Sequence, residues 1–228
     1  VVALGHSFFT LSLGMGAIMA YGAYMPSKQS LGRTILWVGL LDTLVALIAG
    51  MIIFAIVFSN GLEPSSGPGL MFVSLPIAFG SMPGGVFFGT VFFVLVSIAA
   101  LSSAISIAEP AVAWAVEKGI SRIVASVTIC GFAWFIGLGS VLSFNEWSEY
   151  KLFGKTFFDV LDFLTSSIML PLGGLLIAIF VGWFMSTDMI RKEMRMKNDV
   201  IFTVWRFILR FISPVAITLI FINGLGLL

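Results

Sequence analysis

Long apolar stretches run along most of this chain and restrict its fold more than any other feature. A membrane-spanning helix needs about 20 mostly apolar residues, because the hydrocarbon core of a bilayer is about 30 Å thick. Six segments of the 228-residue sequence meet this requirement, at roughly residues 4–24, 34–58, 86–116, 120–142, 157–184 and 201–225. The sequence therefore predicts an all-α integral membrane protein with six transmembrane helices.

The composition supports a membrane environment and excludes several other classes of protein. Hydrophobic residues make up 59% of the chain and charged residues 10%, whereas a water-soluble domain normally has about 25% charged residues. The net charge of +1 gives no electrostatic support for a nucleic-acid partner. Cys130 and His6 are each the single residue of their kind, which excludes a disulfide within the chain and argues against a Cys–His metal site.

The distribution of basic residues predicts how the bundle is oriented in the membrane. One set of alternate loops and helix ends carries Lys28, Arg33, Lys118, Arg122, Arg191, Lys192, Arg195, Lys197, Arg206 and Arg210. The opposite loops have only Lys151 and Lys155, next to Glu146 and Glu149. By the positive-inside rule the first set faces the cytoplasm. We therefore expect a multi-pass protein of the plasma (inner) membrane, with the amino end of this sequence outside.

The chain order suggests three parts. We expect residues 1–184 to form a first unit of five helices, residues 185–200 a basic cytoplasmic loop, and residues 201–228 a final helix. The sequence starts at Val1 without a basic region or a small-residue cleavage site, so we expect a piece of a longer protein rather than a signal peptide.

The connection over residues 59–85 is long for a helix bundle. It contains Gly67-Pro68-Gly69 followed by the apolar residues 70–73, and a proline near the first turn suits a helix start. This pattern predicts a short helix that dips back toward the outer mouth of the bundle. A plain surface loop is the alternative, but the many apolar side chains favour a buried face.

Glycines interrupt the first segment near its middle, at Gly14-Met15-Gly16. Glycine disfavours a helix interior by about 1 kcal/mol, and unwound backbone at membrane depth survives only where it lines a cavity or is buried in protein. Broken helices of this kind form the binding sites of many transporters, although close helix packing through small residues is an alternative. A second break is predicted near residues 171–174, Pro-Leu-Gly-Gly.

Asp42 is a carboxylate within the apolar second segment. An unpaired carboxylate there costs at least about 2.5–3.5 kcal/mol, so Asp42 must pair with a cation, bind a proton or face water. We take His6, which shares a helix face with Thr10, as its candidate partner in this chain. Two interpretations of Asp42 stay open: a structural ion pair and a functional cation site.

Small polar residues form a stripe on the third segment, at Ala99, Ser102, Ser103 and Ser106, followed by Glu109. Spacings of three and four place most of them on one helix face. Close helix packing is one interpretation, and a sodium site made of hydroxyl and carbonyl oxygens is the other. Two further carboxylates, Asp159 and Asp162, lie near the outer end of the fifth segment, and for Asp159 we expect simple solvation.

Residues 3–17, Ala-Leu-Gly-His-Ser-Phe-Phe-Thr-Leu-Ser-Leu-Gly-Met-Gly-Ala, closely resemble the sixth helix of bacterial neurotransmitter:sodium symporters. Residues 67–76 resemble the fourth extracellular loop of that family, residues 99–105 its eighth helix, and residues 205–214 the start of its eleventh. The resemblance implies the C-terminal half of a sodium-dependent amino acid transporter, covering helices six to eleven. The fold would be the second inverted repeat of the leucine-transporter-type fold plus one further helix, with the first five helices absent.

The resemblance also implies roles for individual residues. Six residues would face the substrate, with the first as an aromatic lid: Phe9, Thr10, Ser12, Met15, Ser103 and Ile107. Thr10 and Asp42 would belong to the first sodium site. The second sodium site would take Ala99 through its carbonyl, Ser102 and Ser103. Asp162 would be the carboxylate of an outer gate, and His6 would take part in the charge balance.

Three positions depart from the family pattern. Asp42 stands where the family usually has Asn, His6 where many members have Gln, and Ala46 where members have Ser or Glu. The negative charge is thus one helical turn away from its usual place. We therefore expect transport to require sodium ions, which are carried with the substrate, and not to require chloride.

The function implied is secondary active symport: a sodium gradient drives uptake of an amino acid, hydrophobic or aromatic in character, by alternating access. The expected partners are the amino acid, the lipid bilayer and the missing N-terminal helices of the same protein. The alternatives are a symporter of biogenic amines or other small solutes, or a non-transporting receptor with the same fold. An intramembrane hydrolase using His6, Asp42 and a serine has no nucleophile motif to support it, so we do not expect an enzyme.

Overall fold

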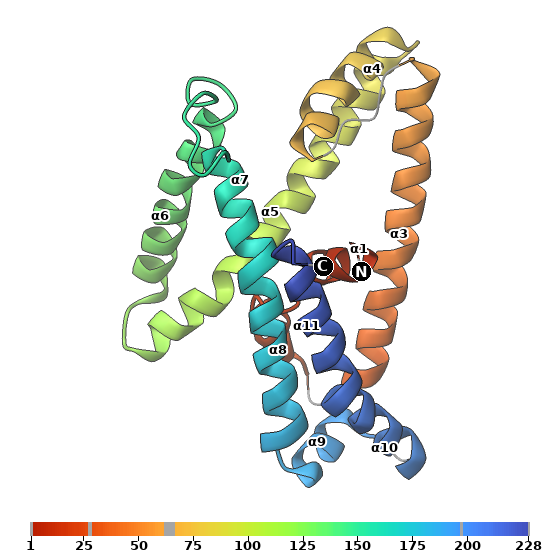
Figure 1. Cartoon of the computed structure of the whole chain (residues 1–228), viewed down its shortest axis with the longest axis vertical. Coiled ribbons are helices and arrows are strands. Elements are labelled where there is room, and N and C mark those ends of the chain that lie inside the picture. Colours follow the sequence, from red (N-terminus) through yellow and green to blue (C-terminus); the bar gives the residue numbers. More distant parts are fainter. Residues whose placement is uncertain (1, 27–28, 62–66, 197, 228) are drawn as a thin grey trace. The chain divides into compact units, whose positions relative to one another are not determined.

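The computed structural model describes residues 2–26, 29–61, 67–196 and 198–227, which are mostly helical (Figure 1). The α-helices of these residues are α1 (Val2–Thr10), α2 (Ala17–Tyr24), α3 (Leu31–Ser59), α4 (Leu75–Ser81), α5 (Gly85–Glu117), α6 (Arg122–Leu142), α7 (Phe157–Asp162), α8 (Leu170–Ile179), α9 (Thr187–Met194), α10 (Asp199–Phe207) and α11 (Ser213–Gly224). The π-helical segments are η1 (Leu70–Ser74), η2 (Phe163–Met169), η3 (Phe180–Phe184) and η4 (Ile208–Ile212).

The chain divides into two compact units. The larger unit comprises Val1–Ile35 together with Ser106–Leu228, and the smaller unit comprises Leu36–Ile105. The division falls inside the long helices α3 and α5, so each of these helices contributes to both units.

The predicted membrane spans are found with one exception. Within the described residues, five helices are long and apolar enough to cross a bilayer: Leu31–Ser59, Gly85–Glu117, Arg122–Leu142, Phe157–Phe184 and Asp199–Gly224. The predicted span over residues 4–24 is instead two short helices, α1 and α2, because the chain between them is not helical. The interruption of this first segment agrees with the prediction from its glycines, while the count of six transmembrane helices is not confirmed by the described residues.

Prolines follow three of the π-helical segments. Pro76, Pro171 and Pro214 lie two residues after the ends of η1, η2 and η4, respectively. Proline has no N–H and its ring collides with the carbonyl four residues earlier, and a wider π turn accommodates that ring. The chain thus stays helical across residues 171–174. The break predicted there was wrong, because η2 absorbs the proline and both glycines lie inside α8.

Helices α8 and α11 run side by side in the larger unit (Figure 1). Phe8 of α1 packs against both of them in an apolar cluster with Ala178, Ile217 and Ile220. Burial of a phenylalanine side chain contributes about 1.5–3 kcal/mol. This cluster anchors α1, and so it fixes the point at which the first segment becomes non-helical.

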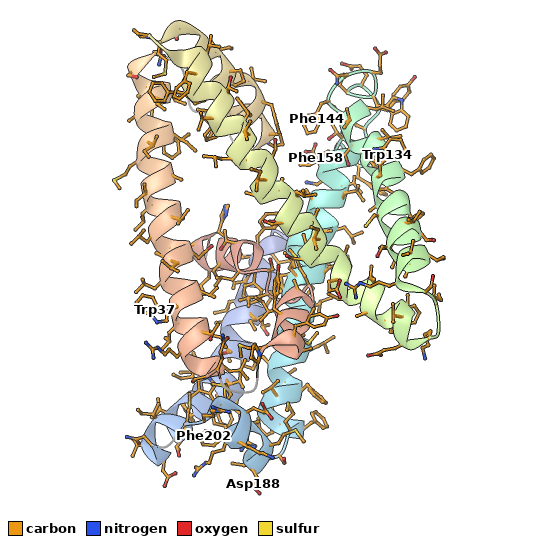
Figure 2. The ribbon with its side chains drawn as sticks, turned by 180° about the vertical axis from the view of Figure 1, so that it is seen from behind. Trp37, Trp134, Phe144, Phe158, Asp188 and Phe202 are labelled. Carbon is orange, nitrogen blue, oxygen red and sulfur yellow. The ribbon has the colours of Figure 1, made fainter. Side chains whose placement is uncertain are left out.

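A hairpin joins α6 to α7 in the same unit. The buried Ser143 hydroxyl accepts a hydrogen bond from the Phe158 N–H at 3.3 Å, and the Phe144 and Phe158 ring centroids are 4.9 Å apart (Figure 2). Thr156 and Asp159 form a capping box at the start of α7. We expected Asp159 to be only solvated. It is exposed, but it also caps the amino end of α7.

The smaller unit contains most of α3 and α5, together with η1 and α4. Val57, Leu75 and Phe79 form its apolar cluster. The segments η1 and α4 make a short apolar helix over Leu70–Ser81, and its re-entry toward the bilayer stays a prediction. Residues 62–66 of this connection lie outside the described residues, as do Lys28 and Lys197 of the predicted basic side.

Candidate functional site

The non-helical stretch between α1 and α2 is the most distinctive feature of the larger unit. Helix α1 ends at Thr10 and α2 begins at Ala17. Ser12 (φ 52°), Gly14 (φ 84°) and Gly16 (φ 84°) have left-handed backbone conformations. A residue other than glycine in this region costs on the order of 1–3 kcal/mol, so its surroundings must hold Ser12 in place. The predicted interruption is confirmed, and it extends back to Leu11.

The interruption packs directly against α8. A Cβ atom on Gly14 would lie 2.4 Å from the Leu170 carbonyl oxygen, and a Cβ atom on Gly174 would lie 2.5 Å from Cε1 of Phe8. The neighbour of Gly14 is backbone, so Gly14 cannot take a side chain, whereas a side chain at Gly174 would displace the Phe8 ring. Close packing through small residues, considered as an alternative to unwound backbone, therefore occurs together with it.

Two hydrogen bonds close the carboxyl end of α1 at the start of the interruption. The Phe8 carbonyl accepts from the Leu13 N–H at 2.8 Å, and the Phe9 carbonyl accepts from the Ser12 N–H at 3.1 Å. The carboxyl end of α1 carries partial negative charge and the amino end of α2 carries partial positive charge. Such paired ends attract cations and carboxylates, respectively.

A cavity of about 380 Å³ adjoins the interruption. Its lining includes Ser7, Ser12, Gly14, Gly174, Ser213 and Ile217. This volume lies within the usual range of small-molecule sites, about 300–1,000 Å³. Of the predicted substrate residues, Ser12 lines this cavity. Phe9 and Thr10 have exposed side chains at the end of α1.

A polar network that the sequence did not predict holds the far end of α2. The Tyr24 hydroxyl donates to Glu109 Oε1 at 2.7 Å, and Arg122 pairs with Glu109 Oε2 at 2.6 Å. Tyr21 is hydrogen-bonded to Ser106. Helix α2 is thus tied to α5, which is in turn tied to α6. A carboxylate in an apolar segment was the available signal, but its partner lies 85 residues away in the sequence.

The polar stripe on α5 places oxygen atoms next to one another. The Ser102 hydroxyl donates to the Ala99 carbonyl at 2.8 Å, a bond that Ser often makes within a helix. Ser103 follows with an exposed side chain. Hard cations bind carbonyl and hydroxyl oxygens. Both interpretations of the stripe, close helix packing and a sodium site, therefore stay open.

The residues predicted for the first sodium site belong to different units. Thr10 and His6 lie in the larger unit, whereas Asp42 is half-buried on α3 in the smaller unit. The same division separates Ser12 and Met15 from Ser103. The pairing of Asp42 with Thr10 or with His6 therefore stays a prediction.

The remaining predicted residues lie on the long helices of the larger unit. Asp162, at the end of α7, is exposed and accepts a hydrogen bond from the Ser166 hydroxyl at 3.0 Å. Ile107 is exposed on α5. Both side chains are accessible in the structure, as a gate residue and a pocket residue would need to be.

Comparison with known proteins decides the family. A family model described as the sodium:neurotransmitter symporter family matches residues 1–227. The chain belongs to the sodium:neurotransmitter symporter family. Together with its apolar helices, this makes it a multi-pass plasma-membrane protein of that family.

Individual members of the family are similar over most of the chain. The crystal structure of MhsT in complex with L-phenylalanine has a TM-score of 0.90 and 43% identity, covering 97% of this chain and 51% of that chain. The uncharacterized sodium-dependent transporter YhdH of Bacillus subtilis (strain 168) is 39% identical, covering 99% of this chain and 51% of the relative. The sodium- and chloride-dependent taurine transporter of Canis lupus familiaris is 27% identical over 59% of this chain and 24% of the relative. The chain thus spans about half the length of YhdH and of MhsT.

Proposed function

We propose that this chain is the C-terminal part of a sodium-coupled symporter of hydrophobic or aromatic amino acids that works by alternating access. The observation that carries the proposal is the unwound stretch between Thr10 and Ala17, in a chain that shares its fold with MhsT bound to L-phenylalanine. No bond is made or broken in this function, so the residues serve binding and movement rather than catalysis.

Three of the proposed substrate-facing side chains favour an apolar substrate. Phe9 offers an aromatic ring at the end of α1, Met15 is flexible and adapts to different shapes, and Ile107 adds an apolar surface on α5. The free backbone groups of the stretch would hold the charged amino and carboxylate groups of the substrate. Thr10, Ser12 and Ser103 complete the residues proposed to contact the substrate.

Sodium would bind at two places. The first site takes Thr10 and Asp42. The second site takes the Ala99 carbonyl with Ser102 and Ser103, and the 2.8 Å contact of Ser102 with Ala99 supports it by keeping two oxygens together. Asp162 would serve as the outer gate.

The test of the function is uptake by the full-length protein in liposomes of plain phospholipid. An inward sodium gradient should drive accumulation of labelled L-phenylalanine, and a potassium gradient should not. Unlabelled leucine or tryptophan should compete, whereas glycine and dopamine should compete weakly. Competition by dopamine alone would favour an amine symporter. Sodium-dependent binding without accumulation would favour a non-transporting receptor.

Asp42 leads to a prediction about chloride. A sodium ion and a zwitterionic substrate bring net positive charge into a low-dielectric site, where an uncompensated charge is costly. We expect Asp42 to supply the compensating negative charge, since Ala46 has no polar group. Uptake should then be unchanged when gluconate replaces chloride, and Asp42→Asn should remove most of it.

Serine at position 46 provides the matching control. Ala46→Ser in the Asp42→Asn background should restore uptake that depends on chloride, whereas Ala46→Ser alone should leave uptake independent of the anion. Loss of wild-type uptake in gluconate would show that this assignment of the charge is wrong.

A further inference from the structure

A second pocket, of about 400 Å³, lies between α9 and the helix formed by α10 and η4. Its lining combines guanidinium groups, hydroxyls and aromatic rings: Arg191, Arg206, Arg210, Thr187, Thr203, Phe202, Phe207 and Phe211. Among these described residues there are three arginines and no carboxylate. The transport function proposed above uses none of them.

The two arginines of the last span are held by neutral groups. Arg206 donates to the Thr187 hydroxyl and, at 3.5 Å, to the Met185 carbonyl. Its Nε atom is buried without a hydrogen-bond partner among the described residues. Arg210 donates to the Gly182 carbonyl at 2.5 Å, with its guanidinium 5.4 Å from the Trp183 ring centroid. These bonds fix both side chains, and within the described part of the chain neither arginine forms an ion pair with a carboxylate.

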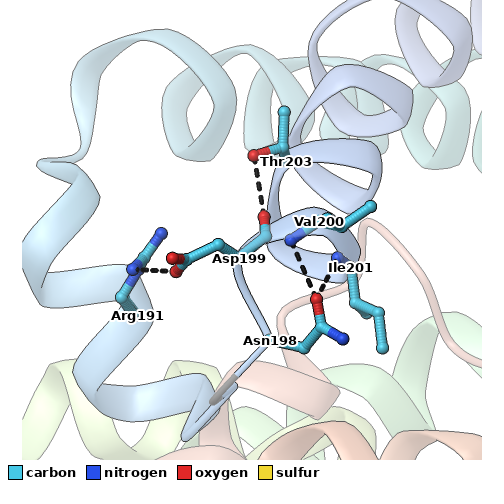
Figure 3. A network of polar contacts seen from close by, with 6 residues as sticks. All are labelled: Arg191, Asn198, Asp199, Val200, Ile201 and Thr203. Carbon is cyan, nitrogen blue, oxygen red and sulfur yellow. Dashed lines mark hydrogen bonds and ion pairs between the residues drawn. The ribbon is translucent and has the colours of Figure 1, made fainter.

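The carboxylate closest in the chain is already used by the third arginine. Asp199 pairs with Arg191 at 2.5 Å (Figure 3), and its side chain is 77% exposed. Arg191 also lies over the Phe202 ring, 4.7 Å from its centroid. Arg206 and Arg210 are four residues apart on one face, where like charges repel each other. The arrangement therefore favours an anion from outside the described chain.

The position of the pocket indicates what kind of anion fits. Arg206 and Arg210 are 7 and 11 residues beyond Asp199, which corresponds to about 10 and 16 Å along a helix. Long arginine side chains at such depths reach toward the nearer interface, here the one predicted to be cytoplasmic. Phe207 and Phe211 are exposed beside them. A ligand that matches both features has an anionic head and an apolar tail.

We propose that Arg206 and Arg210, with Arg191 at the rim, bind the phosphate of an anionic phospholipid of the cytoplasmic leaflet, whose acyl chains cover Phe207 and Phe211. Arginine binds phosphate oxygens through paired, charge-assisted hydrogen bonds, and basic pockets between helices on this side of a membrane bind lipid head groups. The bound lipid joins α9 to the start of the last span, because Thr187 and Arg191 belong to the same pocket.

The experiment uses the full-length protein in mild detergent with phosphatidylglycerol, phosphatidylcholine or inorganic phosphate as the probe. Native mass spectrometry should show a tightly held phosphatidylglycerol that phosphatidylcholine does not replace. The double variant Arg206→Gln/Arg210→Gln should weaken phosphatidylglycerol binding by about tenfold or more. The control Arg33→Gln/Lys118→Gln removes the same charge on the same predicted side outside the pocket, and should bind as the wild type does.

Two further measurements keep the proposal open to contradiction if the double variant does not fold. Arg191→Gln alters only the exposed rim and should weaken binding by a smaller factor. A photoactivatable phosphatidylglycerol should label wild-type protein within residues 187–211. Labelling elsewhere, equal weakening in the control variant, or equal stabilisation by inorganic phosphate alone would overturn the lipid site.

Discussion

Gly14 illustrates how single atoms determine the course of the chain between α1 and α2. Its φ is 84°, and a Cβ atom added to it would lie 2.4 Å from the Leu170 carbonyl oxygen, so both features exclude other residues. Ser12 shares the left-handed conformation without being glycine, so neighbouring contacts compensate for its strain. The unwound stretch is therefore imposed by packing on α8 as much as by weak helix propensity.

Replacing Gly14 by Ala should destabilise the full-length protein. The backbone conformation alone costs about 1–3 kcal/mol, and the clash with α8 adds to it. The apparent melting temperature in detergent should fall by roughly 5 °C or more, and sodium-driven uptake should be lost. Gly22→Ala is the matched control, since a Cβ atom at Gly22 meets nothing within 4 Å. Equal effects of both substitutions would show that packing at Gly14 is unimportant.

The serines of α5 give a second prediction at this scale. Ser102→Ala together with Ser103→Ala removes two hydroxyl oxygens with little change in volume. If the stripe is a sodium site, the sodium concentration for half-maximal uptake should rise about tenfold or more, with an unchanged melting temperature. Ser97→Ala is the control, since the Ser97 hydroxyl donates to the Phe93 carbonyl of its own helix, at 2.7 Å. A lower melting temperature with unchanged sodium dependence would favour a packing role.

At the scale of elements, the helices of this protein depart from regular α geometry where prolines and glycines require it. Three π-helical segments precede Pro76, Pro171 and Pro214, and the chain stays helical across each of these prolines. Between α1 and α2 the chain instead loses its helical form. The function proposed above relies on the second arrangement, in which the chain leaves the helical form.

The network on α2, α5 and α6 predicts energetic coupling between elements. Glu109→Gln and Arg122→Gln should each lower the melting temperature, because each breaks the 2.6 Å ion pair. The double variant should lose little more than one single variant, because both substitutions remove the same ion pair. Glu146→Gln in the predicted outer loop is the control. Strictly additive losses would show that the ion pair does not contribute.

At the scale of the whole molecule, the chain exposes far more apolar surface than a self-contained protein. Hardly any side chain of the apolar core of α3 or α5 is buried within the structure. Lipid or further protein must cover these helices. Since the chain spans about half the length of YhdH and MhsT, we expect the other half of the transporter to cover part of them.

Residues 1–228 alone should therefore not transport. Each proposed sodium site would have few ligands, and an ion with too few ligands does not leave water. Reconstituted without further protein, the chain should show no sodium-driven uptake of L-phenylalanine, whereas the full-length protein should. Robust uptake by residues 1–228 would mean that these residues contain a complete binding site.

The sequence by itself determined the features that depend on local chemistry. Apolar length predicted the spans at residues 34–58, 86–116, 120–142 and 201–225, because a bilayer requires a minimum length of apolar helix. The glycines at 14 and 16 predicted the interruption, since glycine weakens helices wherever it occurs. Family-specific residues predicted the family.

Only the tertiary structure decided which residues meet. Glu109 joins Tyr24 and Arg122 from different helices, and no local pattern encodes such a contact. The proline and glycines at residues 171–174 looked like a break, yet η2 accommodates the proline and the Gly14 backbone packs against the glycines. Propensity is a weak local preference that packing overrides, so long-range contacts settled whether each irregular sequence became a break or a continuous helix.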